Sequence, residues 1–170
     1  MERPLVQIYE ILQKMVGFHR KLLDITNAER DAIVHANVED LQKILTLKQS
    51  IIDSIHEAEQ TRVKATSELA TLWSRSPNDL TLKNIIGKVH SVDPKFGEQL
   101  RSTFHALTEY IQRVMDQNSD NRSFLEKSLD HNQKMRRNVL GESSQKGSTY
   151  TQQGQHLRPN PGSRFISKEV

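Results

Sequence analysis

Residues 29–62 read ERDAIVHANVEDLQKILTLKQSIIDSIHEAEQTR and join the end of one amphipathic segment to the start of another. The two segments are separated by a polar break, HANVEDLQ, at residues 35–42. Within the break, Asn37 precedes Asp40 at the spacing of a helix N-cap, and the acids Glu39 and Asp40 suit the positive end of a helix dipole. Because the break is short, we expect the two segments to fold back as an antiparallel helical hairpin.

Outward from the break, apolar residues recur at alternating spacings of three and four in both directions, which is the pattern of a coiled-coil seam. Pro4 is well placed for the first turn of the first helix. Each arm of about 33 residues would be roughly 50 Å long. The first seam is Leu5, Ile8, Leu12, Met15, His19, Leu22, Thr26, Glu29 and Ile33, and the second is Leu41, Ile44, Lys48, Ile51, Ile55, Ala58, Arg62, Ala65, Leu69 and Leu72.

Three positions of these seams are charged, namely Glu29, Lys48 and Arg62. In a hairpin that turns near Asn37, Glu29 and Lys48 would face one another to within about one helical turn. We expect both side chains to reach the edge of the hairpin, where such a pair contributes roughly 0–1 kcal/mol. A buried pair that fixes the register of the two helices is the alternative.

After Trp73, the stretch SRSPNDL at residues 74–80 predicts a turn, and residues 79–90 predict a short helix. Asp93 and Pro94 then predict the N-cap and first turn of a last helix over residues 94–140, which Gly141 would end. The apolar stripe of this helix is interrupted at Asn118 and Asn121. It resumes with Phe124, Leu125, Leu129, Met135 and Val139, and Asn132 lies on the same face. This second part either continues the bundle or forms an exposed face that receives another helix.

The sequence therefore predicts an all-α fold, with an elongated antiparallel helical hairpin plus a long C-terminal helix in a three-helix bundle or coiled-coil-like arrangement. We expect a helical domain at residues 1–140 and a flexible basic tail at residues 141–170. A hydrophobic content of 35% with 26% charged residues suits such an assembly better than a large dry core. Residues 131–170 hold seven Lys and Arg against two acids, a charge of +5, which leaves −2 of the total +3 for the rest.

Several function classes are disfavoured by what the chain contains. It has no cysteine, no glycine-rich phosphate loop, no paired histidines at metal-ligand spacing and no recognisable catalytic constellation. We therefore expect no enzyme activity, no cofactor and no metal. The basic residues of the tail are scattered and have only Tyr150 and Phe165 as aromatics, so we expect a solvated tail without nucleic-acid binding, and a nucleic-acid-binding tail is the alternative. Without a secretory signal or a long apolar segment, we expect a cytoplasmic protein that does not insert into membranes.

The hairpin residues Glu29, Asn37, Leu41, Lys48 and Arg62 are spaced as in the first hairpin of the FlgN family, the flagellar export chaperones. The stretch QNSDNRSFLEKSLDHNQKMRRNVL (117–140), followed by STYTQQGQ (148–155), resembles that family's Asn-bearing last helix and its Tyr-x-x-x-Gly tail. One departure is Asn37, which stands where the family usually has an acid, and Asn caps a helix as well as Asp does.

The resemblance implies an all-helical cytoplasmic escort for the hook–filament junction proteins FlgK and FlgL. Such a chaperone binds the C-terminal helical segment of its substrate, prevents premature association and delivers it to the type III export gate or its ATPase complex. From its aromatic character we expect Tyr150 to be the anchor that docks to the export gate, because an aromatic offers a large contact area, and the alternative is that it is an incidental residue of the tail. A generic coiled-coil adaptor or scaffold without an export role is the alternative. The predicted substrate-binding residues are Asn118, Asn121, Phe124, Leu125, Leu129, Asn132, Met135 and Val139.

Overall fold

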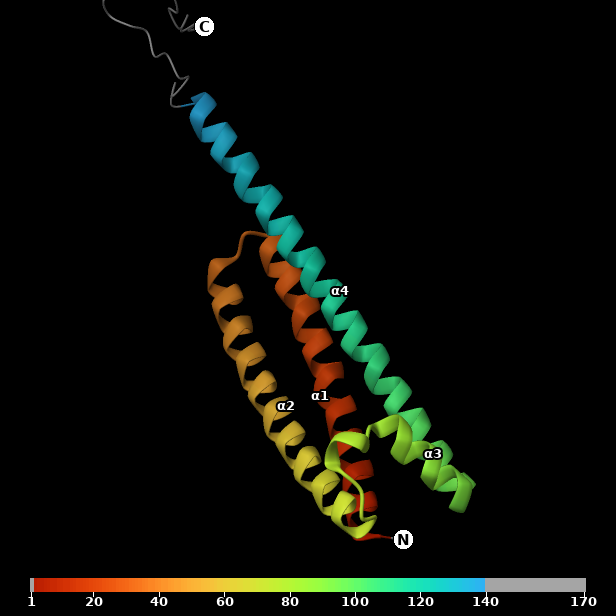
Figure 1. The fold of residues 1–170 in the computed structure, drawn as a ribbon. Helices are drawn as coiled ribbons and strands as arrows, with labels where there is room; N and C mark the ends of the chain where they lie inside the picture. The colour runs from red at the N-terminus through yellow and green to blue at the C-terminus, as the bar shows by residue number, and fades with distance from the viewer. Residues whose placement is uncertain (1, 140–170) are drawn as a thin grey trace, which may run out of the picture. The chain divides into compact units, whose positions relative to one another are not determined.

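A computed structural model describes residues 2–139, and they contain helices and no β-strand (Figure 1). The all-α prediction is therefore confirmed. The chain divides into two compact units, residues 1–128 and 129–170, which are described separately below. The predicted tail at 141–170 lies outside the described residues. The helices are α1 (Arg3–Val34), α2 (Val38–Leu72), the 3₁₀ helix η1 (Pro77–Asp79), α3 (Leu82–Val92) and α4 (Pro94–Val139).

The predicted hairpin is confirmed, with its turn at residues 35–37 between α1 and α2 (Figure 1). After α1 ends at Val34, Ala36 adopts a left-handed conformation with φ at 51°, and the Asn37 N–H donates to the carbonyl of Ala32 at 3.0 Å. The Asn37 side chain then accepts a 3.1 Å hydrogen bond from the Asp40 N–H and begins α2. One residue thus closes one helix and caps the next.

The second connection differs from its prediction at one boundary. Pro77–Asp79 forms a 3₁₀ turn, and α3 begins only at Leu82 rather than at residue 79. The cause is local, because the Thr81 hydroxyl accepts the Asn84 N–H at 3.3 Å and makes Thr81 the N-cap. The predicted start of the last helix is confirmed. Asp93 accepts the Phe96 N–H at 3.0 Å, and Pro94 is the first residue of α4.

Two apolar clusters hold the first unit together. The larger one joins all four α-helices of this unit around the fully buried side chains Ile8, Leu12, Leu69, Ile85 and Leu100. The smaller one contains Leu22, Leu23 and Val114, with half-buried residues of α2 and α4 packed against it. Between the smaller cluster and the hairpin turn, the contacts between α1, α2 and α4 become polar.

Candidate functional site

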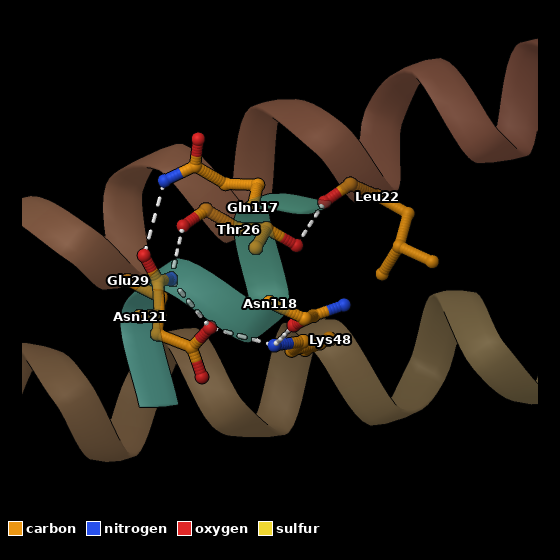
Figure 2. A network of polar contacts seen from close by, with 7 residues as sticks. All are labelled: Leu22, Thr26, Glu29, Lys48, Gln117, Asn118 and Asn121. Carbon is orange, nitrogen blue, oxygen red and sulfur yellow. Dashed lines mark hydrogen bonds and ion pairs between the residues drawn. The ribbon is translucent and has the colours of Figure 1, made fainter. Parts of the chain in front are cut away.

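The polar contacts are centred on an ion pair between the arms of the hairpin (Figure 2). The Lys48 ammonium on α2 lies 2.6 Å from the Glu29 carboxylate on α1. Only 15% of the Lys48 side chain and 11% of the Glu29 side chain are exposed. The expectation of an exposed edge pair is therefore wrong, and the pair is largely buried. A two-helix hairpin would leave its edge in water, but here α4 covers it.

Two asparagines of α4 complete the network (Figure 2). Asn118 accepts a 2.7 Å hydrogen bond from the Lys48 ammonium through its side-chain oxygen. The Asn121 side-chain N–H₂ donates to the Thr26 backbone carbonyl at 2.9 Å and to the Glu29 carboxylate at 3.1 Å. Asn121 is only 3% exposed, and its own oxygen accepts from Gln117 at 3.0 Å. The network therefore ties α1, α2 and α4 together at one level of the bundle.

The chemistry of this network is structural. One carboxylate and one ammonium are partly removed from water, and each keeps a charge partner and an amide partner, which offsets the cost of desolvation. The Thr26 hydroxyl donates to the Leu22 carbonyl at 2.7 Å, so this buried side chain is satisfied as well. The register of α4 on the hairpin is thereby specified, because a shift of one turn would leave both charges without their amides.

The third charged seam residue, Arg62, has a different environment. Its guanidinium makes two hydrogen bonds to the Glu59 carboxylate of the same helix, at 2.6 and 2.8 Å. This contact raises the pKa of Arg62 above its ordinary value, against the opposing effect of partial burial. The pair lies within α2 and does not join two helices, so it supports the helix rather than its register.

The predicted site residues in the first unit fall into two groups. Asn118 and Asn121 face the hairpin. Phe124 is half-buried, and the guanidinium carbon of Arg30 lies 4.2 Å from the centroid of the Phe124 ring. Arg30 also donates to the Asp120 carbonyl at 3.1 Å. Leu125, in contrast, is 40% exposed. Three of these four side chains, all but Leu125, therefore contact side chains or backbone of the hairpin helices α1 and α2.

In the second unit, the remaining predicted residues lie on the last turns of α4. Leu129 and Met135 are each 53% exposed, Val139 is 77% exposed, and Asn132 is exposed as well. The proposed docking residue Tyr150 lies outside the described residues. Sequence reasoning missed the roles of Thr26 and Arg30. A signal existed for Thr26, which is a polar residue on the first seam, but nothing local to Arg30 marks its contact with α4.

A family comparison identifies what kind of protein this is. The model of the FlgN protein family matches residues 5–158, nearly the whole chain. The chain belongs to the FlgN family. FlgN proteins are flagellar export chaperones, so the general role of this chain is that of a chaperone in flagellar export. Its binding partners, at this level, are flagellar proteins.

A second comparison finds a similar protein of about the same length as this FlgN chain. The chain is 26% identical over 122 residues to the uncharacterized protein YvyG of Bacillus subtilis strain 168, a match that covers 72% of each chain. No solved structure matches the chain.

The described part of this FlgN chain was compared with two kinds of site, a cluster of metal ligands and a membrane-spanning helix. Residues 2–139 contain no group of three or more His, Cys, Asp or Glu side chains arranged to hold a metal ion. None of the helices described there is long and apolar enough to cross a bilayer. The hairpin residues singled out in the sequence have conformational roles, with Asn37 as a helix cap and Glu29 and Lys48 as a buried pair.

Proposed function

We propose that this FlgN protein is the cytoplasmic chaperone of the hook–filament junction proteins FlgK and FlgL. It binds the C-terminal helical segment of either client, keeps that segment from associating before assembly, and delivers it to the flagellar type III export gate. Membership of the FlgN family supports the general role. The choice of clients follows from the family resemblance of the hairpin and the last helix.

The observation that carries the proposal is the row of exposed apolar side chains along α4. Leu129, Met135 and Val139, all in the unit that begins at Leu129, are between 53% and 77% exposed. Their spacings of three and four residues, with Asn132 among them, place them on one side of a helix. A single exposed apolar residue is ordinary, but a row at this spacing is the kind of face that pairs with another amphipathic helix.

The other predicted residues have a supporting part in this proposal. The amides of Asn118 and Asn121 are engaged by α1 and α2, so we assign them to holding α4 at a fixed register. Phe124 lies between these asparagines and Leu125, where Arg30 covers its ring. Client contact at Asn118, Asn121 and Phe124 would require the client to reach the rim of the polar network. Asn132 is the polar group on this face that can fix the register of the client helix.

The experiment that tests the proposal is calorimetric titration of the full chain with the purified C-terminal helical segment of FlgK, and separately of FlgL, at moderate salt. We expect one-to-one binding with a negative heat-capacity change, because apolar surface is buried. Absence of a complex with both segments would overturn the assignment of clients. Stable self-association together with indifference to both segments would favour the generic scaffold instead.

A further inference from the structure

The last turns of α4 carry one charged residue in line with the exposed apolar ones. In the second unit, Leu129, Asn132, Arg136 and Val139 follow one another at spacings of three, four and three residues. This is the spacing of the a and d positions of a heptad, so the four side chains lie in one line along the helix. All four are exposed. Arg136 therefore occupies a seam position, between Asn132 and Val139.

The other charged residues of this segment lie away from the seam. With Arg136 at an a position, the remaining charged or titratable residues of 129–139 fall at the outward-facing b, c and f positions. They are Asp130 and Arg137 at b, His131 at c and Lys134 at f. The Lys134 ammonium lies 2.7 Å from the Asp130 carboxylate, one helical turn away. The one acid of residues 129–139 is thus paired on the outward side, and none lies on the seam.

A guanidinium at a seam position is costly once a second helix packs there. The apolar neighbours exclude water, and a charge without a partner then loses hydration that nothing replaces. The group that fits best is a carboxylate, because the planar fork of Arg donates two parallel hydrogen bonds to its two oxygens. Only Leu129 and Val139 give the seam apolar contact, with Met135 beside it. The polar positions must therefore contribute to affinity as well.

We propose that the client helix carries an Asp or Glu that faces Arg136, and that this pair sets the register of the client on α4. The proposal rests on the proposed function and adds a specificity-determining residue to the predicted binding face. The client is thereby narrowed to an amphipathic helix whose apolar stripe is interrupted by a carboxylate. A slip by one heptad would place that carboxylate against Leu129 and leave Arg136 without it, so one alignment is favoured.

The same charges disfavour a second copy of the chain as the occupant. In a parallel pair, a positions face a positions, so Arg136 would face the Arg136 of the other copy. In an antiparallel pair, a positions face d positions, which here are Asn132 and Val139. Neither arrangement brings a carboxylate to the guanidinium, and the first places like charges together.

The end of this chain is also a poor occupant. Residues 141–170 hold four Lys and Arg against two acids, Glu142 and Glu169. Residues 129–139 hold three Lys and Arg against one acid. Both segments have a net positive charge, so they repel one another on average. A separate helix with an acid in its apolar stripe has no such penalty.

Arg136→Leu tests the proposal by the sign of its effect. If the client carries the acid, affinity for the purified C-terminal segment of FlgK or FlgL should fall about tenfold or more, because the acid is left buried without a partner. If Arg136 instead turned its head to the edge over an apolar client residue, the substitution would add apolar contact and raise the affinity. Leu and Arg have similar helix propensities, so we expect circular dichroism to show an unchanged fold.

The measurement is calorimetric titration of the full chain at moderate salt. The matched control is Arg137→Leu, which makes the same change of charge and size at an outward-facing position. We expect it to leave the affinity nearly unchanged. A loss of the same size in both variants would show that the total charge of the segment matters rather than a partner at Arg136, and would overturn the proposal.

A double-mutant cycle then locates the acid on the client. Each Asp of the client segment is replaced in turn by Asn and each Glu by Gln, and every segment is titrated against the unsubstituted chain and Arg136→Leu. One replacement should weaken binding to the unsubstituted chain about tenfold and have little further effect on Arg136→Leu. Independent effects at every client acid would contradict the proposal.

The remaining outcomes separate this inference from the proposed function. If neither segment binds the unsubstituted chain, both are wrong. If a segment binds and Arg136→Leu leaves its affinity equal or higher, only this inference is wrong. Gel filtration at the same concentrations identifies a second copy, because a loss of affinity that arises only from self-association of Arg136→Leu overturns the proposal. So does a rise in affinity on replacing both Glu142 and Glu169 by Gln that disappears in Arg136→Leu, since the acid would then be the chain's own.

Discussion

Asn121 on α4 and Glu29 on α1 are joined by a 3.1 Å hydrogen bond from the Asn121 amide to the Glu29 carboxylate. The oxygen that accepts this bond is the same one that pairs with Lys48 of α2 at 2.6 Å. A single buried carboxylate oxygen therefore links three helices. A buried pair repays its desolvation only when every partner is in place, so we expect this oxygen to contribute more to the register of the three helices than to net stability.

Removal of the carboxylate should be costly. We expect Glu29→Ala to lower the free energy of unfolding by about 3 kcal/mol, because Lys48 then stays largely buried without its charge partner. Urea denaturation followed by circular dichroism measures this. The matched control is Lys43→Ala, whose fully exposed pairs with Glu39 and Asp40 should leave the free energy of unfolding nearly unchanged. Equal effects of the two substitutions would show that the Glu29 pair behaves as a surface pair.

A double substitution separates the cost of leaving one buried charge unpaired from the net contribution of the pair. The double variant Glu29→Met with Lys48→Met removes both charges and fills their space with apolar side chains. We expect its stability to lie within about 1 kcal/mol of the unsubstituted chain, well above that of Glu29→Ala. Denaturation under the same conditions decides this. A double variant as unstable as the single one would mean that the amides of Asn118 and Asn121 cannot tolerate the loss of both charges.

The two glycines Gly97 and Gly87 should respond to alanine with opposite signs. A Cβ at Gly97 meets the backbone of His90 at 2.5 Å, so Gly97→Ala must push α3 and α4 apart and should cost about 1–3 kcal/mol. A Cβ at Gly87 meets nothing within 4 Å, so Gly87→Ala should stabilise α3 by about 1 kcal/mol. Thermal and urea unfolding of both variants test this pair. A stabilised Gly97→Ala chain would contradict the close contact of α3 with α4.

The client face on α4 is tested most cleanly at Leu129. We expect Leu129→Ala to weaken binding of the junction-protein segment by about 1–3 kcal/mol, as truncation of an anchor does, without loss of stability, since the residue is 53% exposed. Phe124→Ala should weaken binding by a similar amount, but it also removes the contact with Arg30, so its stability must be measured in parallel. Calorimetry gives the affinities, with Leu47→Ala as control. Unchanged affinity in both variants would move the client face elsewhere.

The elements that follow local rules could be predicted from the sequence. Asn37 and Asp93 cap their helices because a short polar side chain in front of an apolar repeat is sufficient for that role. The start of α3 was missed because Pro77 and Thr81 both favour a helical start, and only the structure shows that Thr81 caps α3 while Pro77 begins a separate 3₁₀ turn.

The buried network could be predicted only in part, because its burial depends on a third helix. The facing of Glu29 and Lys48 follows from the hairpin. The polar interruption of the last helix at Asn118 and Asn121 can be read directly from the sequence. That these four groups meet depends on how α4 is aligned with the hairpin, which no local pattern encodes. For that reason the sequence predicts Asn118 and Asn121 as part of a client face, while in the structure their amides bond to Lys48 and to the Thr26 carbonyl.

We propose that α4 binds the client and that Tyr150 docks to the export gate, and these separate roles give a further prediction. Tyr150→Ala should leave the affinity for FlgK and FlgL segments unchanged, because the exposed apolar row on α4 is intact, and it should weaken docking of the loaded chaperone to the export gate. Calorimetry measures the first, and co-purification with the purified cytoplasmic part of the gate measures the second. Gln153→Ala, a nearby polar substitution, is the control and should alter neither. A chain that loses client affinity as well would show that Tyr150 belongs to the client-binding surface rather than to a separate docking anchor.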